Sequence, residues 1–316
     1  MKADVLVIGG STYDLTGFVA ADTVWGDSNP GSVSGRAGGV GRNIAENSAR
    51  MGLKTSLITA TGTDLFSQEI LNVCLGAGID VSHSLILEDR RADCYMAILS
   101  KESELHLAVA DYSLLESVDP GVFSGTSFAE FLNGFRALFV DTNCTEEMLA
   151  NIFDAARVPV YSDTVSEAKA VRLLPYLDRL HSLKVNRAEL AVLSGMPAEN
   201  LQEIREASMS LIDRGVREVF VTMGKKGACC FTESEAFSVP EYPTEVRDVT
   251  GAGDSFAAAA LYGALRGHSL RDRLLLGTAA AHITLQYPGS CCGDMCEEYL
   301  LQEFEITSGF LTPEPV

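Results

Sequence analysis

The 316-residue sequence is poor in positive charge and has no long apolar run. Lys and Arg number 24 against 43 Asp and Glu, which gives a net charge of −19 at pH 7. A surface of this sign repels a phosphate polymer, so nucleic acid is not an expected partner. All apolar runs fall short of the roughly 18 residues that a membrane span needs, so no membrane association is expected either.

The start of the sequence lacks the features of a signal peptide. Its apolar run, Val5 to Ile8, is too short for one and is typical of a first buried strand. Eight cysteines are scattered without the density of a disulfide scaffold, which predicts free thiols in a cytoplasmic protein. Cys291, Cys292 and Cys296 fit no common zinc spacing and have no histidine nearby, so loop and core thiols are favoured over a metal site.

Two widespread nucleotide-binding signatures are also absent. No Gly-x-x-x-x-Gly-Lys-Ser/Thr run occurs, which excludes a P-loop protein. Gly38-Gly39-Val40-Gly41 lacks the third glycine of a dinucleotide fingerprint, and no dehydrogenase-type acid follows a strand at the right distance, which argues against an oxidoreductase. Because there is no internal repeat, low-complexity segment or Pro/Ser-rich linker, the sequence predicts one domain over residues 1–316.

What the sequence does contain is strand and helix in alternation. Short apolar runs predict strands at Val5 to Ile8, Lys54 to Thr59, Ala137 to Val140, Val158 to Tyr161 and Val219 to Thr222. Helical patterns lie between them at Leu65 to Gly76, Glu146 to Ala156, Ala188 to Leu193 and Gln202 to Arg214. This order is typical of an α/β protein with a doubly wound, mostly parallel sheet, whose ligands bind at the carboxyl ends of the strands.

Two stretches interrupt the alternation. Asp14 to Ala37 is polar, rich in glycine and non-helical, and Arg91 to Val109 predicts two short strands around a turn at Lys101 to Glu104. Both fit a small β-flap lid, at about residues 14–37 and 91–110, that projects from the main sheet. The exposed edge of such a flap often pairs with another chain, so a homodimer through the lid is left open.

The strongest chemical signal is the segment Asp-Val-Thr-Gly-Ala-Gly-Asp, from Asp248 to Asp254. Small residues open an alanine-rich helix here, so the backbone N–H groups of its first turn are accessible and can bind an anion with the help of the helix dipole. Asp254 adds a carboxylate to that turn, which suits a base beside a transferring phosphoryl group. In the alternative, a glycine-capped helix with Asp254 stabilising the dipole, the run of small residues is unexplained.

The same segment resembles the C-terminal signature of the ribokinase-like (PfkB) kinases, Asp-x-x-Gly-Ala-Gly-Asp. The resemblance implies an ATP-dependent kinase that uses Mg²⁺ and phosphorylates a small sugar or nucleoside. It implies that Asp254 deprotonates the acceptor hydroxyl and that the amides of Gly251, Ala252 and Gly253 form an anion hole. It leaves open a monovalent cation such as K⁺, which some relatives bind near the residues that match Asp248, Thr250 and Gly289.

Further segments follow in the order of this family. Gly38 to Ala45 resembles its N-terminal signature, Asn186 to Glu189 its Asn-x-x-Glu element, and Thr222 to Gly227 its Thr-x-Gly-x-x-Gly turn. The resemblance implies acceptor contacts at Asp14, Gly38, Gly39 and Asn43, nucleotide contacts at Asn186, Glu189, Thr222, Gly224 and Gly227, and Mg²⁺ at Glu189 through water. Each segment alone also has an ordinary structural explanation; Asn186 and Glu189, for example, lie one helical turn apart like a surface pair.

The acceptor is indicated by a narrower likeness within the family. Asp27 to Gly31, Asp141 to Asn143, Asp163 to Ser166 and Val249 are similar to members that phosphorylate pseudouridine, and Val40 stands where ribose-specific members carry Lys. Asn29 is therefore a candidate contact to the nucleoside, although Asn-Pro-Gly forms a turn in any case. Adenosine, inosine, fructose or a keto-sugar acid stay open as acceptors. So does a non-catalytic nucleoside sensor, which would need neither Asp254 nor Glu189.

Overall fold

The computed structural model describes residues 3–102 and 104–316. Within them, the main sheet has nine strands in the order β15-β14-β13-β12-β11-β10-β9-β1-β4. Neighbours from β12 to β4 pair in parallel, whereas β13, β14 and β15 form an antiparallel edge. The strands are β1 (Val5–Ile8), β4 (Thr55–Ile58), β9 (Ala137–Asp141), β10 (Val160–Asp163), β11 (Leu180–Asn186), β12 (Glu218–Thr222), β13 (Ala228–Phe231), β14 (Ala236–Val239) and β15 (Glu314–Pro315).

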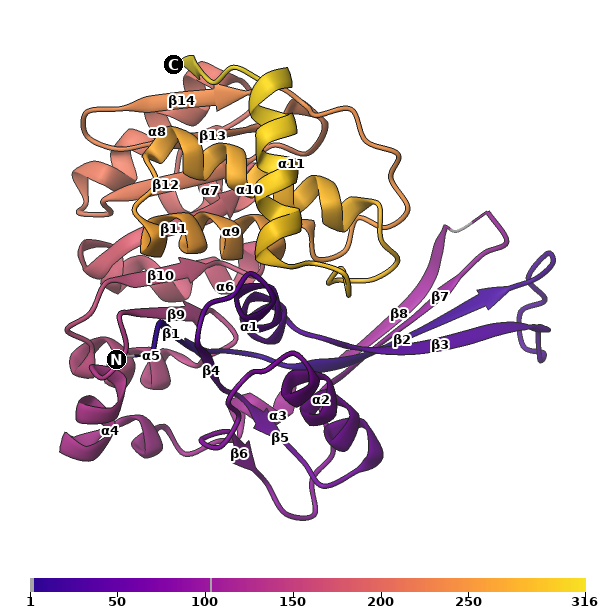
Figure 1. The fold of residues 1–316 in the computed structure, drawn as a ribbon. Coiled ribbons are helices and arrows are strands. Elements are labelled where there is room, and N and C mark those ends of the chain that lie inside the picture. The colour runs from indigo at the N-terminus through magenta and orange to yellow at the C-terminus, as the bar shows by residue number, and fades with distance from the viewer. Residues whose placement is uncertain (1–2, 103) are drawn as a thin grey trace.

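Helices cover both faces of this sheet (Figure 1). One face packs against α4 (Gly125–Leu132), α5 (Glu146–Ala155), α7 (Arg187–Ser194) and α8 (Leu201–Asp213). The other packs against α1 (Val40–Arg50), α2 (Leu65–Gly76), α9 (Ala252–Arg266), α10 (Leu270–Leu285) and α11 (Glu297–Phe310). The pattern of β1 explains both layers: successive side chains of a strand point to opposite faces, so Leu6 and Ile8 join the first core and Val5 and Val7 the second.

A second sheet of four strands forms the predicted lid. β2 (Thr12–Val19), β3 (Gly31–Gly38), β7 (Cys94–Leu99) and β8 (Leu105–Asp111) lie in the order β3-β2-β7-β8 and extend away from the main sheet (Figure 1). The polar, glycine-rich stretch from Asp14 to Ala37 forms mostly the antiparallel pair β2–β3. Ser103, in the turn predicted between β7 and β8, lies outside the described residues.

The doubly wound α/β fold expected from the sequence is confirmed. The strand predicted at Val158 to Tyr161 begins and ends two residues later, because the buried polar residues Ser162 and Asp163 still pair with both neighbouring strands. The sequence did not predict β11 or the antiparallel edge, whose strands carry polar or small residues among the apolar ones. None of the described helices is both long and apolar enough to span a membrane.

Candidate active site

The anion-binding turn predicted from the sequence is the N-terminus of α9. Gly251 caps this helix with φ 76°, in the left-handed region, and no side chain caps the amides that follow. A side chain at residue 251 would also collide with the backbone of Ser290, so only glycine fits there. The first-turn N–H groups have no acceptor within the helix, which leaves Ala252 and Gly253 able to bind an anion.

Asp254 lies in this first turn with its side chain buried. Its Oδ2 accepts a hydrogen bond of 2.6 Å from Nδ2 of Asn43 in α1. Burial raises the pKa of the Asp254 carboxyl to about 6, and the charge of Asp163 adds to the rise, whereas Lys184 and the Asn43 hydrogen bond oppose it. A carboxylate with a pKa near 6 is mostly ionised at neutral pH and basic enough to take a proton from a hydroxyl group in a transition state.

The orientation of Asn43 is fixed by Arg42, whose guanidinium is fully buried. It donates to Oδ1 of Asn43 and to Ser290 Oγ, the latter at 2.9 Å, and Ser290 Oγ in turn donates to Asn43 Oδ1. Because the amide oxygen is held by two donors, the amide nitrogen faces Asp254. Arg42 also donates to the carbonyls of Ala37 at 2.8 Å and Gly38 at 3.2 Å, where β3 enters α1, and forms an ion pair with Glu46.

A cavity of about 350 Å³ lies between the main sheet and the root of the lid, with Asp254 in its wall. Three further residues predicted for acceptor binding line it, Asp14, Gly39 and Asn43. The Asp14 carboxylate accepts from Thr12 Oγ1 at 2.8 Å, and burial raises its pKa. Gly38 does not line the cavity, but a side chain there would collide with the Asp14 carboxylate, so this glycine makes room for Asp14.

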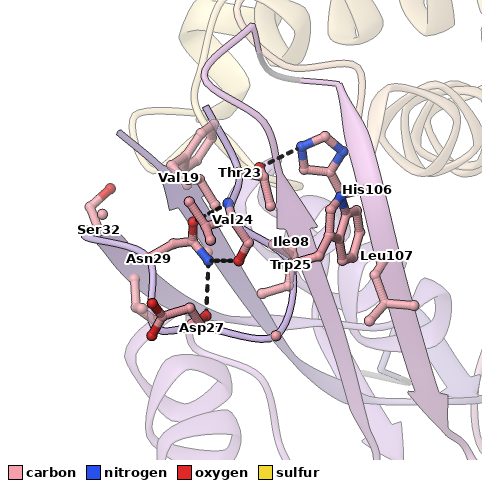
Figure 2. A pocket seen from close by; sticks show the side chains of 15 residues that line it. Val19, Thr23, Val24, Trp25, Asp27, Asn29, Ser32, Ile98, His106 and Leu107 are labelled. Carbon is pink, nitrogen blue, oxygen red and sulfur yellow. Dashed lines mark hydrogen bonds between the residues drawn. The ribbon is translucent and has the colours of Figure 1, made fainter. Parts of the chain in front are cut away.

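Asn29 is not brought to this cavity. It lies at the tip of the lid, in the wall of a separate hollow of about 380 Å³, as Figure 2 shows. Its Oδ1 accepts from the amide of Val24 at 2.8 Å, and its Nδ2 donates to the carbonyls of Val24 and Asp27 (Figure 2). The side chain is thus engaged with its own loop. The structure fits the turn-forming alternative for this segment better than a contact between Asn29 and a nucleoside in the same chain.

Several residues of the acceptor cavity were not singled out from the sequence. Lys169, on the short helix α6 (Glu167–Ala170), donates to Asn143 Oδ1 at 2.8 Å and lies over the ring of Tyr112. Tyr95 of the lid and the buried Asp93 complete this end of the wall. These residues come from distant parts of the chain, so no local spacing could have joined them.

A second cavity, of about 490 Å³, opens on the other side of the α9 N-terminus. It contains the predicted nucleotide residues Thr222, Gly224 and Gly227, together with apolar side chains of the loop before α9 and of α10. Gly227 has φ 88°, and a side chain there would collide with the backbone of Val239 and Pro240. A mostly apolar cavity of this size, with glycines in its lining, fits a nucleoside triphosphate.

Asn186 and Glu189 form a capping box at the start of α7. The Glu189 amide donates to Asn186 Oδ1 at 2.9 Å, and the Asn186 amide donates to Glu189 Oε2 at 2.7 Å. The same Asn-x-x-Glu spacing recurs at Asn200 and Glu203, where Asn200 caps α8, and none of these four residues lines either cavity. Spacing alone therefore does not mark a functional pair. What distinguishes Asn186 is its place: it pairs with Thr222 on β12, at the carboxyl edge beside the second cavity.

Three ionisable side chains form a row along this edge of the sheet. Asp141, Asp163 and Lys184 end or nearly end the neighbouring strands β9, β10 and β11, and they are opposite one another in the strand register. Lys184 Nζ donates to Asp163 Oδ2 at 2.9 Å. Burial raises the pKa of Asp141 to about 6, although its carboxylate accepts from the amides of Gly10 and Asn143. The signal for this row in the sequence is Lys184, a lysine between the apolar residues Leu183 and Val185.

Among the three residues predicted near a monovalent cation, the Asp248 side chain holds the loops of Thr250 and Gly289 together. Asp248 Oδ1 accepts from the amide of Thr250 at 2.9 Å, and Oδ2 accepts from the amide of Gly289 at 3.0 Å. Both carboxylate oxygens thus have backbone donors, which explains Asp248 without an ion. A K⁺ site here stays a prediction.

The segment from Val249 to Asp254 is the wall between the two cavities. Thr250 and Asp254 face the acceptor cavity, while Val249, Ala252 and Gly253 face the second one. A group held in the second cavity would present its charged end to the same helix N-terminus that carries Asp254. This is the arrangement that direct transfer of a phosphoryl group between two bound molecules requires.

A family model described as pfkB family carbohydrate kinase matches residues 2–294. The chain belongs to this family. Kinases of the family transfer a phosphoryl group to a hydroxyl group, so this chain is a sugar or nucleoside kinase with a ribokinase-like fold.

Individual relatives agree with this assignment. The pseudouridine kinase of Escherichia coli (strain K12) is 32% identical over 260 residues, which cover 81% of this chain and 82% of that protein. An uncharacterized sugar kinase of the same organism, YeiI, is 31% identical over 281 residues, 88% of this chain and 77% of its own. The structure of Arabidopsis thaliana ribokinase complexed with ribose and ATP superposes with a TM-score of 0.84 at 22% identity, covering 96% of this chain and 99% of that one.

Proposed function

We propose that this chain transfers the γ-phosphoryl group of ATP to the 5′-hydroxyl of a nucleoside, and that the nucleoside is pseudouridine. The observation that carries the transfer reaction is the shared wall, Val249 to Asp254, with one cavity on each side. The choice of pseudouridine is supported by the 32% identity to a pseudouridine kinase over 81% of the chain.

In the proposed reaction, the Asp254 carboxylate takes the proton of the acceptor hydroxyl as the hydroxyl oxygen attacks the γ-phosphorus. Asn43 keeps the carboxylate aimed at the acceptor cavity through its 2.6 Å hydrogen bond. The amides at Gly251, Ala252 and Gly253 donate to the phosphoryl oxygens, where charge is greatest during transfer. The lid, which roofs the acceptor cavity through Asp14 and Tyr95, would exclude water.

Mg²⁺ is assigned to Glu189. The residue is buried, and only its Oε2 is used in the capping box, so among the described residues Oε1 has no hydrogen-bond partner. A carboxylate oxygen that accepts no hydrogen bond from the protein suits a hard cation or one of its waters. When bound, Mg²⁺ would offset negative charge on the phosphate oxygens of the nucleotide.

The acceptor cavity contains groups that suit a pyrimidine nucleoside. Tyr95 and Tyr112 offer aromatic faces, and Lys169 offers ammonium hydrogens to a carbonyl oxygen. Pseudouridine differs from uridine in presenting a ring N–H where uridine has C–H, so an acceptor oxygen in the wall would favour it. Of the two candidates for that oxygen, Asp14 and Asn29, only Asp14 lines this cavity.

Turnover of ATP with a panel of nucleosides and sugars tests the proposal. We expect kcat/KM for pseudouridine to exceed that for uridine by at least about tenfold, because a buried oxygen without its partner is costly. Equal rates on both nucleosides, or a faster reaction with adenosine, inosine, fructose or a keto-sugar acid, would overturn the acceptor. A protein that binds nucleosides without ATP turnover would be a sensor and would overturn the reaction itself.

We also propose that two chains pair through their lids. The outer strands β3 and β8 are sheet edges, and side chains of large apolar residues along the lid are exposed, among them Val33 at 79% and Leu105 at 59%. Sedimentation of the purified protein should give twice the 33.8 kDa mass of one chain. A Val33→Asp variant should shift it toward the monomer. A monomer at all concentrations would contradict pairing.

A further inference from the structure

Lys184 is a lysine in the interior of a sheet. It lies in β11, two residues before Asn186, and its side chain is only 13% exposed. Its register partner on β10 is Asp163, which accepts a hydrogen bond of 2.9 Å from its ammonium. Lysine is rarely buried unless it is paired or has a function.

The ammonium lies against the anion-binding turn. An ideal Cβ added to Gly253 would be 2.7 Å from Lys184 Nζ, which means that the absence of a side chain at residue 253 is what lets the ammonium approach the helix N-terminus. Gly253 itself faces the nucleotide cavity. The ammonium is therefore next to the place where the transferred phosphoryl group would bind.

Asp163 accounts for only part of the hydrogen-bonding capacity of Lys184. An ammonium has three N–H donors, and in the described part of the chain Asp163 Oδ2 is the one acceptor that it reaches. By contrast, the guanidinium of Arg42, the other buried cation beside Asp254, is used by Glu46, Asn43, Ser290 and two backbone carbonyls. Lys184 thus has donors left for a ligand, whereas the Arg42 guanidinium already has five acceptors around it.

The charges around Lys184 are predominantly negative. Burial lowers the pKa of Lys184. The negative charges of Asp163, Glu189 and Asp254 raise it by more than burial lowers it, so the pKa lies above its usual value. A triphosphate that enters this acidic site needs a fixed positive charge beside it. Lys184 is placed to supply that charge at the turn itself.

We propose that Lys184 is a catalytic residue that contacts the transferring phosphoryl group, and that Asp163 is a positioning residue that holds it there. The inference rests on the proposed kinase reaction. As the acceptor oxygen forms its bond to phosphorus and the bond to the ADP oxygen breaks, the acceptor proton moves to Asp254 and Lys184 keeps its own. Its ammonium donates to phosphoryl oxygens that gain charge as the group is transferred.

The test compares Lys184→Met, Lys184→Arg and the double variant Lys184→Met/Asp163→Asn. The double variant removes both charges of the Lys184–Asp163 pair, so Asp163 is not left as an unpaired carboxylate and the test stays valid if the single variant does not fold. Glu218→Gln is the control, because Glu218 forms a buried ion pair with Arg273 at the start of β12, at the end of the sheet away from the anion-binding turn. Full-length protein is used throughout, with the acceptor that wild type phosphorylates fastest.

We expect Lys184→Met and the double variant to lose at least about 100-fold in kcat, as removal of one charged donor does at such sites, while the acceptor KM changes less than about threefold. Lys184→Arg should recover part of the loss, and Glu218→Gln should affect thermal stability alone. The second readout is calorimetric affinity for MgADP with aluminium fluoride, a mimic of the transferring group. It should fall at least about tenfold in the variants, with the affinity for MgADP alone unchanged.

A double variant with kcat within about threefold of wild type would overturn the proposal. So would equal losses of affinity for MgADP and for its aluminium fluoride complex, because these would indicate a structural ion pair. If wild type phosphorylates no acceptor in the panel, the proposed function fails. The binding measurement still decides the role of Lys184 in that case, because it does not depend on turnover.

Discussion

The ionisation of Asp254 offers a sharp test of the site, because two neighbours act on it with opposite sign. A base must be deprotonated to work, so kcat/KM for the acceptor should decrease as the pH drops below the pKa of Asp254. Burial and the charge of Asp163 raise that pKa to about 6. At that pKa, about nine tenths of the carboxyl is ionised at pH 7 and about one tenth at pH 5. We therefore expect roughly a tenfold lower rate at pH 5 than at neutral pH.

In a plot of kcat/KM against pH, the fall on the acid side is called the acid limb here. Asp163→Asn should move this acid limb to lower pH. Removing the negative charge of Asp163 makes ionisation of Asp254 easier, and the Lys184 ammonium, released from its 2.9 Å contact, can then stabilise the same carboxylate. Both effects lower the pKa, by roughly one unit in total for charges at this range. Lys184→Met removes a positive charge that lowers the pKa of Asp254, so the acid limb of this variant should move to higher pH.

The measurement is the initial rate at subsaturating acceptor and saturating MgATP, between pH 4.5 and about 8.5, at constant ionic strength. The substrates titrate in the same way with wild type, Asp163→Asn and Lys184→Met. Differences between the acid limbs of the three profiles therefore arise from groups of the protein. Each profile is scaled to its own plateau, since both substitutions are also expected to lower the plateau. Limbs at the same pH in all three proteins, or shifts of the opposite sign, would show that Asp254 is not the group that titrates.

Three further outcomes are expected. Asp254→Asn should fold normally and lose 10²–10⁴-fold in kcat, the usual range for a general base; turnover near that of wild type would remove the assignment. Glu189→Gln should weaken the Mg²⁺ dependence of turnover. It should leave the melting temperature almost unchanged, because Gln can also complete a capping box. The matched control, Glu203→Gln at α8, should leave both the Mg²⁺ dependence and the melting temperature unchanged. Gly253→Ala should keep or raise helix stability by up to about 1 kcal/mol but lower kcat, because its Cβ would displace the Lys184 ammonium; an unchanged kcat would contradict that contact.

The sequence was sufficient for the parts of the structure that depend on local patterns. Apolar runs such as Val5 to Ile8 and Ala137 to Val140 correspond to central strands, because a strand buried on both faces needs a continuous apolar stretch. The position of Asp254 in the first turn of α9 also follows from local sequence, since small residues before an alanine-rich run begin a helix. The lid was predicted as a flap, and the pairing of its strands required the structure.

The parts that the sequence did not reveal depend on contacts between distant residues. Asn29 was a candidate because of its likeness to relatives, but whether its amide faces a ligand or its own loop is decided by hydrogen bonds to Val24 and Asp27. Lys184 needs the register of β10 and β11 to meet Asp163, and the packing of α9 to meet Gly253. Asn186 and Asn200 have the same spacing to a glutamate, and only the strand that precedes Asn186 separates them.

The buried guanidinium of Arg42 determines where the lid can bend. It joins the carbonyls of Ala37 and Gly38, at the end of β3, to Asn43 and Ser290. A planar, multiply bonded group of this kind does not follow a swinging strand without losing several hydrogen bonds at once. The hinge of the lid must therefore lie further out than residue 37. Hydrogen exchange should accordingly be slow from residue 37 to 47 and faster toward the tip at 20–30, so that release of a product can open the roof while Asp254 remains aimed for the next acceptor.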